Sequence, residues 1–265
     1  SEAPPLTFRP GSFDVLKGHG TLRYSFVSTA SNHSLDCGAE GVRSTLAALD
    51  EAGIAHHGVH RSEADAARAT ILERNGIRLA MISHTFGLNG KAPPPDKPWI
   101  VNRTHLNGAP EEIDFGVLRA QIADAHAHGA DMIVGHLHWG LEHEYYPRPA
   151  QLEVAHHLAE LGLDVIIGHH PHLLQPVEHY RTRRDPDRFV PIYYSLGNLI
   201  NPFSHPAFRL GGIACLEFAK GTSVSGRANT YVASANRAEV FQEIDTHTQT
   251  LRLVCATDEH RLTLP

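Results

Sequence analysis

The sequence is poor in several features that would each point to a class of protein. Only three of its 265 residues are cysteine (Cys37, Cys215 and Cys255), and they form no Cys-x-x-Cys pair. Neither a thiolate zinc site nor a disulfide framework is therefore predicted. No apolar run approaches the roughly 20 residues that span a bilayer. The first residues, SEAPPLTFRPGSF, lack the charged and apolar regions of a signal peptide.

Aromatic residues and positive charge are also scarce. Phe, Trp and Tyr make up 7% of the chain, and the formal net charge is −6. A nucleic-acid-binding surface usually needs a basic patch and aromatic platforms for base stacking, so no nucleic-acid partner is predicted. The hydrophobic content of 42% is enough for a sizeable core in a chain of this length.

Histidine, by contrast, is abundant: the chain has 21 histidines against 23 lysines and arginines together. Neutral imidazole is the commonest metal ligand in proteins, so this excess favours a metal site. Four histidines fall in polar or amphipathic stretches and are assigned to the surface, namely His56, His57, His126 and His128.

The first half of the chain shows local signals for strands, a helix and a hairpin. Residues 24–30 are apolar enough for a buried strand, and residues 39–52 carry apolar positions at helical spacing up to Gly53. Two β-like runs within residues 69–85 are joined by Asn75-Gly76, which predicts a hairpin.

From residue 111 onwards, helical and strand patterns alternate regularly. The predicted helices cover 111–129 and 148–162, and the strands that follow them cover 130–140 and 163–170. This order predicts βαβ units in a layered α/β fold. β-like segments at 211–219, 229–234, 238–244 and 249–255 predict an antiparallel second sheet. Since no linker interrupts the chain, we expect one domain, residues 1–265, of two sheets flanked by helices.

Three groups of metal-competent side chains each follow an apolar strand. The groups are Asn32-His33, the pair His136 and His138, and the trio His169, His170 and His172. Ligands gather beyond the carboxyl ends of strands in such sheets, and residues i and i+2 of an extended segment point the same way. A lone histidine at a strand end is more often structural, but three groups at equivalent positions favour a site. Nitrogen and oxygen donors without sulfur suit Zn, Mn, Fe or Ni.

Four motifs occur in order, ASNHSLDCG, HWGLE, GHHPH and YSLGN, within residues 30–198. In this order they resemble the bacterial capsule synthesis (CapA), or poly-γ-glutamate synthesis, family of the calcineurin-like metallophosphoesterase superfamily. The resemblance implies a two-sheet α/β sandwich with a mono- or dinuclear site for divalent metal ions such as Mn, Zn, Fe or Mg.

The resemblance also implies roles for individual residues. Asn32, His138, His170 and His172 resemble the metal ligands, and His33 resembles the residue that faces the substrate and acts as general acid or transition-state stabiliser. The doubled histidine leaves the register of His169 ambiguous. His169 and His136 are alternatively residues of the core or ones that support the ligands.

Three further polar residues lie close to these motifs. Asp36 follows His33 by three positions, a spacing that lets a short helical turn bring its carboxylate to the imidazole in a catalytic role; a simple cap or turn residue is the alternative. Glu142 matches the acidic position of the family. It either orients a ligand histidine or is a solvated carboxylate in a loop. Asn198 ends the strand of YSLGN, where its side chain can reach the pocket.

The sequence departs from the family pattern in two places. Ser31 stands where the family usually has a first asparagine. The superfamily also carries Gly-Asp and Asn-Leu-Glu motifs on its first strands, and PPLTFRP resembles the segment that follows them. We therefore expect a further segment before Ser1, with an Asp and a Glu that complete the metal site. Without that segment, the fold of residues 1–265 is expected to lack its first strand or strands.

Two functions are consistent with these observations. The first is a metal-dependent hydrolase that activates water on a phosphoester or amide substrate. The second is a non-catalytic component of a capsule or poly-γ-glutamate synthesis complex that binds an anionic polymer. Either has a small-molecule or anionic-polymer partner, allows a homo-oligomer, and places the chain in the bacterial cytoplasm or cell envelope.

Overall fold

The computed structural model describes residues 16, 18, 24–183, 185–201, 205–222, 226, 228–245, 248 and 250–256. The segment PPLTFRP, on which the expectation of an upstream segment depends, lies outside the described residues. Helices and strands are both present, which confirms an α/β fold. The chain divides into two compact units, residues 1–138 and 139–265. The expectation of a single domain stays a prediction.

The first unit begins with two short parallel strands joined by a helix. Strand β1 (Phe26–Ser28) pairs with β2 (Ala55–His57), and α1 (Gly38–Glu51) connects them. The helix ends where the sequence predicts, because Gly53 adopts the left-handed conformation (φ 66°). The N–H of Gly53 donates to the Asp50 carbonyl and the N–H of Ile54 to the Leu49 carbonyl. This is the Schellman arrangement, which satisfies the last carbonyl groups of the helix.

The hairpin at Asn75-Gly76 is confirmed. Strands β3 (Thr70–Arg74) and β4 (Ile77–Thr85) are antiparallel, and both turn residues have positive φ, as a type I′ turn requires.

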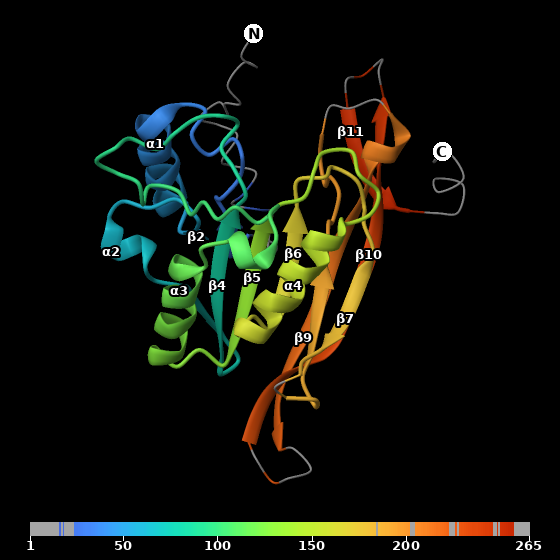
Figure 1. The fold of residues 1–265 in the computed structure, drawn as a ribbon. Coiled ribbons are helices and arrows are strands. Elements are labelled where there is room, and N and C mark those ends of the chain that lie inside the picture. The colour runs from blue at the N-terminus through green and yellow to red at the C-terminus, as the bar shows by residue number, and fades with distance from the viewer. Residues whose placement is uncertain are drawn as a thin grey trace. The chain divides into compact units, whose positions relative to one another are not determined.

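A βαβ unit follows the hairpin. Strand β4 pairs in parallel with β5 (Met132–His138), and α3 (Gly116–Ala127) connects them and packs against β4 (Figure 1). The predicted helix 111–129 is shorter than expected because a 3₁₀ turn, Pro110–Glu112, comes first and Ile113 is extended. The remaining short helix of this unit, α2, covers Glu63–Ala66.

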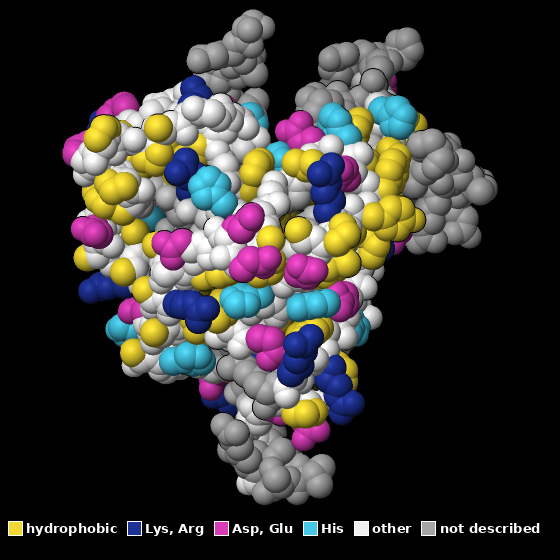
Figure 2. Space-filling model, viewed as in Figure 1, with side chains coloured by type: hydrophobic (Ala, Val, Ile, Leu, Met, Phe, Trp, Pro, Cys, Tyr) yellow, Lys and Arg dark blue, Asp and Glu magenta, His cyan; other side chains and the backbone are white. Residues whose placement is uncertain are grey.

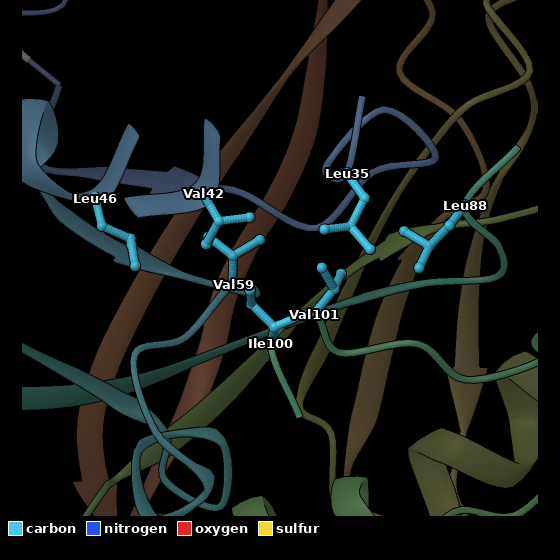
Figure 3. Close-up of a cluster of buried hydrophobic side chains, with 7 residues drawn as sticks. All are labelled: Leu35, Val42, Leu46, Val59, Leu88, Ile100 and Val101. Carbon is cyan, nitrogen blue, oxygen red and sulfur yellow. The ribbon is translucent and has the colours of Figure 1, made fainter. Parts of the chain in front are cut away.

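A hydrophobic cluster lies beneath the loops of the first unit (Figure 3). Its members come from α1, from the turn before it and from later loops: Leu35, Val42, Leu46, Val59, Leu88, Ile100 and Val101. Each of these side chains is at most 3% exposed. Leu35 and Leu88 both belong to the cluster, so it anchors the loop after β1 and the loop after β4 to one another.

The second unit contains a helix and a three-stranded arrangement of mixed direction. Helix α4 (Pro149–Leu161) packs on β6 (Val165–His169). Strand β8 (Phe189–Tyr193) lies between β6, to which it is parallel, and β7 (Val177–Arg181), to which it is antiparallel.

The tail forms the predicted antiparallel sheet, with one correction. Its order is β11-β10-β9, with β9 at Leu210–Thr222, β10 at Ala228–Asp245 and β11 at Thr250–Cys255, after a 3₁₀ turn at Pro206–Arg209. The two strands expected at 229–234 and 238–244 are one continuous strand, β10 (Figure 1). Pairing with β9 carries it through residues 235–237 between them, with an irregularity in register at Val232 and Ser234.

The charged side chains, the cysteines and the helices can be compared with what the composition predicts. Acidic side chains lie among basic ones across the visible face (Figure 2). The three cysteines are exposed and free. Within the described part of the chain, no helix has the length and apolar character to cross a membrane.

Candidate functional site

Serine hydroxyls fix the turn that carries Asn32 and His33. The N–H of Ser31 donates to Ser34 Oγ (2.7 Å), and the N–H of His33 donates to Ser31 Oγ (3.2 Å). Ser34 Oγ in turn donates to the Thr29 carbonyl (2.7 Å), which ties the turn to the end of β1. Ser31, which replaces an asparagine of the family pattern, thus has a place in the turn. Asn32 is left buried, at 3% exposure.

The contact that the i, i+3 spacing predicts between His33 and Asp36 is present. His33 Nδ1 lies 2.8 Å from Asp36 Oδ2, and the side chains are 33% and 6% exposed. A carboxylate only accepts hydrogen bonds, so Nδ1 carries the proton and donates it to Asp36. The carboxylate thus orients the imidazole ring.

Asn32 contacts His138, which ends strand β5. Asn32 Oδ1 accepts a hydrogen bond from His138 Nε2 (2.8 Å). Neighbouring ligands at about 2.1 Å from one octahedral ion are about 3.0 Å apart, so an ion that replaced this proton could contact both atoms. One amide oxygen and one imidazole nitrogen are also suitable donors for a divalent ion. The pair therefore fits two positions of a coordination shell.

Further ligands are not grouped in the same way. Among the residues that the structure describes, no three His, Cys, Asp or Glu side chains form a group that could hold a metal ion. Within the first unit, Asn32 and His138 are in contact, and His33 and Asp36 follow Asn32 in the chain.

Asn89 is a site residue that the sequence analysis missed. It lies in the loop after β4, and its Oδ1 accepts a hydrogen bond from Asn32 Nδ2 (3.0 Å). Its own Nδ2 lies 3.5 Å from His33 Nδ1. The Asn89-Gly90 dipeptide is a turn signal, and both residues have positive φ. That signal predicts the turn but not its contact with a segment 57 positions away.

In the second unit, the GHHPH motif turns sharply after β6. His169 is the last residue of β6, while His170 (φ 105°) and His172 (φ 62°) have left-handed backbones. The segment is therefore not extended, contrary to the basis of the i, i+2 argument for His170 and His172. The turn still leaves their rings close, with centroids 6.3 Å apart.

Asn198 reaches His172, as its position at the end of YSLGN predicts. His172 Nδ1 lies 2.8 Å from Asn198 Oδ1, and Asn198 Nδ2 donates to the carbonyl groups of His172 (3.2 Å) and Phe208 (3.1 Å). Since Nδ2 is committed to two acceptors, Oδ1 is the end that faces the ring. His172 Nδ1 therefore carries the proton, and its Nε2 is the nitrogen suited to a metal ion or substrate.

The loop after HWG holds a second residue that the sequence analysis missed, His143. It has a positive φ of 68°, and its ring packs on Phe208 (4.7 Å between centroids) and lies 6.2 Å from His172. Glu142 is exposed on this loop. Its neighbour Glu144 binds the Arg148 guanidinium (2.6 Å). The sequence gives no signal that His143, and not Glu142, packs beside His172.

Part of the motif pattern is structural. Trp139 Nε1 donates to the Tyr194 carbonyl (2.9 Å), and the two rings are stacked. Gly168 lies between them, where a Cβ would be 2.1 Å from the Tyr194 oxygen and 2.5 Å from Trp139 Nε1. In the first unit, His136 is partly buried and packs on the Phe26 ring, 5.2 Å between centroids.

Several histidines are buried, and burial keeps them neutral. His57, which was assigned to the surface, is 3% exposed; its Nε2 donates to the Arg68 carbonyl and its Nδ1 accepts from the Ser83 N–H. Burial lowers its pKa well below the usual value. Burial likewise lowers the pKa values of His60, His84 and His169 to about 4. The assignment of His57 was wrong because its partners come from other segments.

Comparison with known proteins relates these residues to a family. The profile described as "Bacterial capsule synthesis protein PGA_cap" matches residues 2–202. The matched region includes both sets of site residues and ends before the β9–β11 sheet.

Three curated proteins show the extent of the similarity. The PGA biosynthesis protein CapA of Bacillus subtilis is 30% identical over 192 residues, 71% of this chain and 45% of the relative. The capsule biosynthesis protein CapA of Bacillus anthracis is 29% identical over 188 residues, 71% of this chain and 42% of the relative. A probable polyglutamine synthesis accessory protein of Mycobacterium tuberculosis is 28% identical over 199 residues, 71% of this chain and 49% of the relative. The chain thus spans less than half the length of these relatives.

Proposed function

We propose a function on the premise that the chain belongs to the bacterial capsule synthesis protein family PGA_cap. In this proposal the chain is a metal-dependent hydrolase that cleaves a phosphoester or amide bond in a small molecule or an anionic polymer. The observation that carries the proposal is the position of a carboxylate-bound histidine, His33, next in sequence to Asn32, whose oxygen contacts His138.

Asn32 and His138 would hold a divalent metal ion. When bound, such an ion lowers the pKa of a coordinated water and polarises the oxygen of the bond to be cleaved. His170 and His172 stay proposed ligands, and the contact of His172 Nδ1 with Asn198 Oδ1 would orient the ring of His172 for that role. We propose a hard to borderline divalent cation, such as Mn, Zn, Fe or Mg, and do not choose among these metals.

His33 would deliver a proton to the leaving group. Asp36 fixes the ring by accepting from Nδ1, so Nε2 would be the nitrogen that donates the proton. Adjacent residues of a turn point in different directions, so Asn32 can hold a metal ion while His33 faces the substrate. His33 is therefore proposed as the catalytic acid, and Asp36 as the residue that positions it.

The amide alternative receives support from the relatives. One is named for the biosynthesis of PGA and another as an accessory protein of polyglutamine synthesis. We propose an anionic glutamate polymer as the first substrate to test.

A substrate panel tests the proposal. The protein, loaded in turn with Mn²⁺, Zn²⁺ and Mg²⁺, would be incubated with p-nitrophenyl phosphate, bis-p-nitrophenyl phosphate and poly-γ-glutamate. We expect metal-dependent cleavage of at least one bond class, abolished by a chelator. A metal-loaded protein that cleaves none of them would count against the hydrolase.

A non-catalytic role is the second candidate, and two observations favour it. The mycobacterial relative is named an accessory protein, and the described residues hold no group of three His, Cys, Asp or Glu ligands. In this alternative the chain binds an anionic polymer without cleaving it. Binding of poly-γ-glutamate in a calorimeter, with its chain length unchanged afterwards, would identify this role.

A further inference from the structure

We propose that Asn89 is a positioning residue of the site: it fixes which end of the Asn32 carboxamide faces His138. This inference rests on the proposed function for its effect on metal binding, but the contact itself does not. Asn89 belongs to the stretch FGLNG after β4, which none of the four motifs contains.

The backbone of the loop places the Asn89 side chain over the turn. Asn89 has φ 50° and Gly90 has φ 77°, so two successive residues are left-handed. Asparagine and glycine are the residues that adopt this conformation most readily. Leu88, directly before Asn89, is buried in the same hydrophobic cluster as Leu35, which lies in the turn of Asn32. The two loops are therefore held together from below by packing.

The hydrogen bonds give the Asn32 amide one orientation. Its Nδ2 donates to Asn89 Oδ1 (3.0 Å) and its Oδ1 faces His138 Nε2 (2.8 Å). If the Asn32 amide alone were flipped, its oxygen would face the Asn89 oxygen, and its NH₂ group would face His138 Nε2. Asn32 is 3% exposed with the exposed Asn89 side chain in place, so Asn89 Oδ1 and not bulk water is the acceptor for its Nδ2. Asn89 thus holds the oxygen of Asn32 in the position of a ligand.

Asn89 also contacts the second half of the site. Its Nδ2 lies 3.5 Å from Nδ1 of His33, which donates to Asp36 (2.8 Å). Since both nitrogens are donors, this approach is a packing contact and not a hydrogen bond. One side chain therefore connects the Asn32–His138 pair with the His33–Asp36 pair.

The chain offers a matched control for testing this role. Asn75 has the same φ of 50° and is also followed by a left-handed glycine, but it lies in the β3–β4 hairpin. Asn→Gly at either position removes the side chain while keeping a backbone that glycine adopts without strain. N89G and N75G thus differ in the loss of the contact with Asn32.

The direct readout is the side-chain amide of Asn32 in the metal-free protein. Its two N–H resonances, assigned with Asn32→Asp, would be followed by ¹H–¹⁵N NMR. We expect N89G to shift both resonances and to speed their exchange with solvent, and N75G to leave them in place. Asn32 resonances that are unchanged in N89G would overturn the proposal.

The second readout is Mn²⁺ affinity, measured by calorimetry. Residues that orient metal ligands typically contribute about 10- to 100-fold to affinity, so we expect a loss of that size in N89G and none in N75G. N89D keeps an oxygen acceptor for Asn32 Nδ2 and should bind Mn²⁺ more tightly than N89G. Equal affinities in wild type and N89G would contradict the role toward the metal. A wild-type protein that binds no Mn²⁺ would refute the proposed function, while the NMR readout would still decide whether Asn89 orients Asn32.

Discussion

Asn32 Oδ1 and His138 Nε2 lie 2.8 Å apart, although 106 positions separate the two residues in the chain. The first follows β1 and the second ends β5, so the contact depends on the arrangement of the whole first unit. Neither side chain is a metal site by itself. Because the two side chains are in contact, replacing either one tests whether both belong to one metal site.

Replacement of His138 should therefore weaken metal binding. His138→Ala removes the nitrogen donor and leaves Asn32 as one oxygen donor, so we expect Mn²⁺ affinity to fall by about tenfold or more. Calorimetric titration measures the change. His128→Ala, an exposed histidine at the end of α3, is the control and should bind as the wild type does. The same affinity in both variants would argue against His138 as a ligand.

Replacement of His33 should separate catalysis from metal binding. His33→Ala should lower kcat by about 100-fold or more, because general acid catalysis contributes about that much, while metal content stays at the wild-type value. Metal analysis and the rate on the best substrate of the panel measure the two effects. Loss of the metal together with the activity would show that His33 is a ligand.

Asp36→Asn should give a smaller effect of the same kind. The amide oxygen still accepts from His33 Nδ1, but without the charge of the carboxylate, so the ring is held less firmly. We expect kcat to fall with little change in KM, and less than in His33→Ala. A rate as low as that of His33→Ala would indicate that Asp36 takes a direct part in the reaction.

The buried histidines should make the protein sensitive to acid. His60 and His84 stay neutral in the folded state because burial lowers the pKa of each to about 4. In the unfolded chain their pKa is about 6.5, so between about pH 6.5 and 4 the unfolded state binds more protons. The free energy of unfolding therefore falls as the pH falls through this range, by about 2 kcal/mol per buried histidine at about pH 5.

Urea denaturation at pH 7 and pH 5 measures this loss. His84→Gln removes one titrating group and should reduce the difference between the two pH values. His128→Gln, which removes an exposed imidazole, should leave it unchanged. A pH dependence that is the same in wild type and His84→Gln would show that His84 does not contribute.

Gly168→Ala should destabilise the second unit. The added Cβ would lie 2.1 Å from the Tyr194 oxygen and 2.5 Å from Trp139 Nε1, so backbone must move. Overpacking of this kind costs about 1–3 kcal/mol, and more where the neighbour is backbone. Gly87→Ala is the control, because a Cβ there meets no atom within 4 Å. Equal thermal midpoints in the two variants would contradict this account of the glycine.

The sequence by itself determined the features that depend on neighbouring residues. Gly53 ends α1, Asn75-Gly76 forms the hairpin, and Asp36 reaches His33, because each signal acts over a few positions where chain geometry leaves few alternatives. The α/β order also follows from local periodicity. The motif residues identified the family, and they include Asn32 and His138.

Only the tertiary structure decided which residues contact each other over long distances in the chain. His57 is buried because Ser83 and Arg68 supply its hydrogen bonds, and β10 is continuous because β9 pairs along it. Asn89 reaches Asn32 because Leu88 and Leu35 share one hydrophobic cluster. Burial and long-range pairing depend on the sum of many weak contacts between segments. A local sequence pattern does not predict which distant segment will make those contacts.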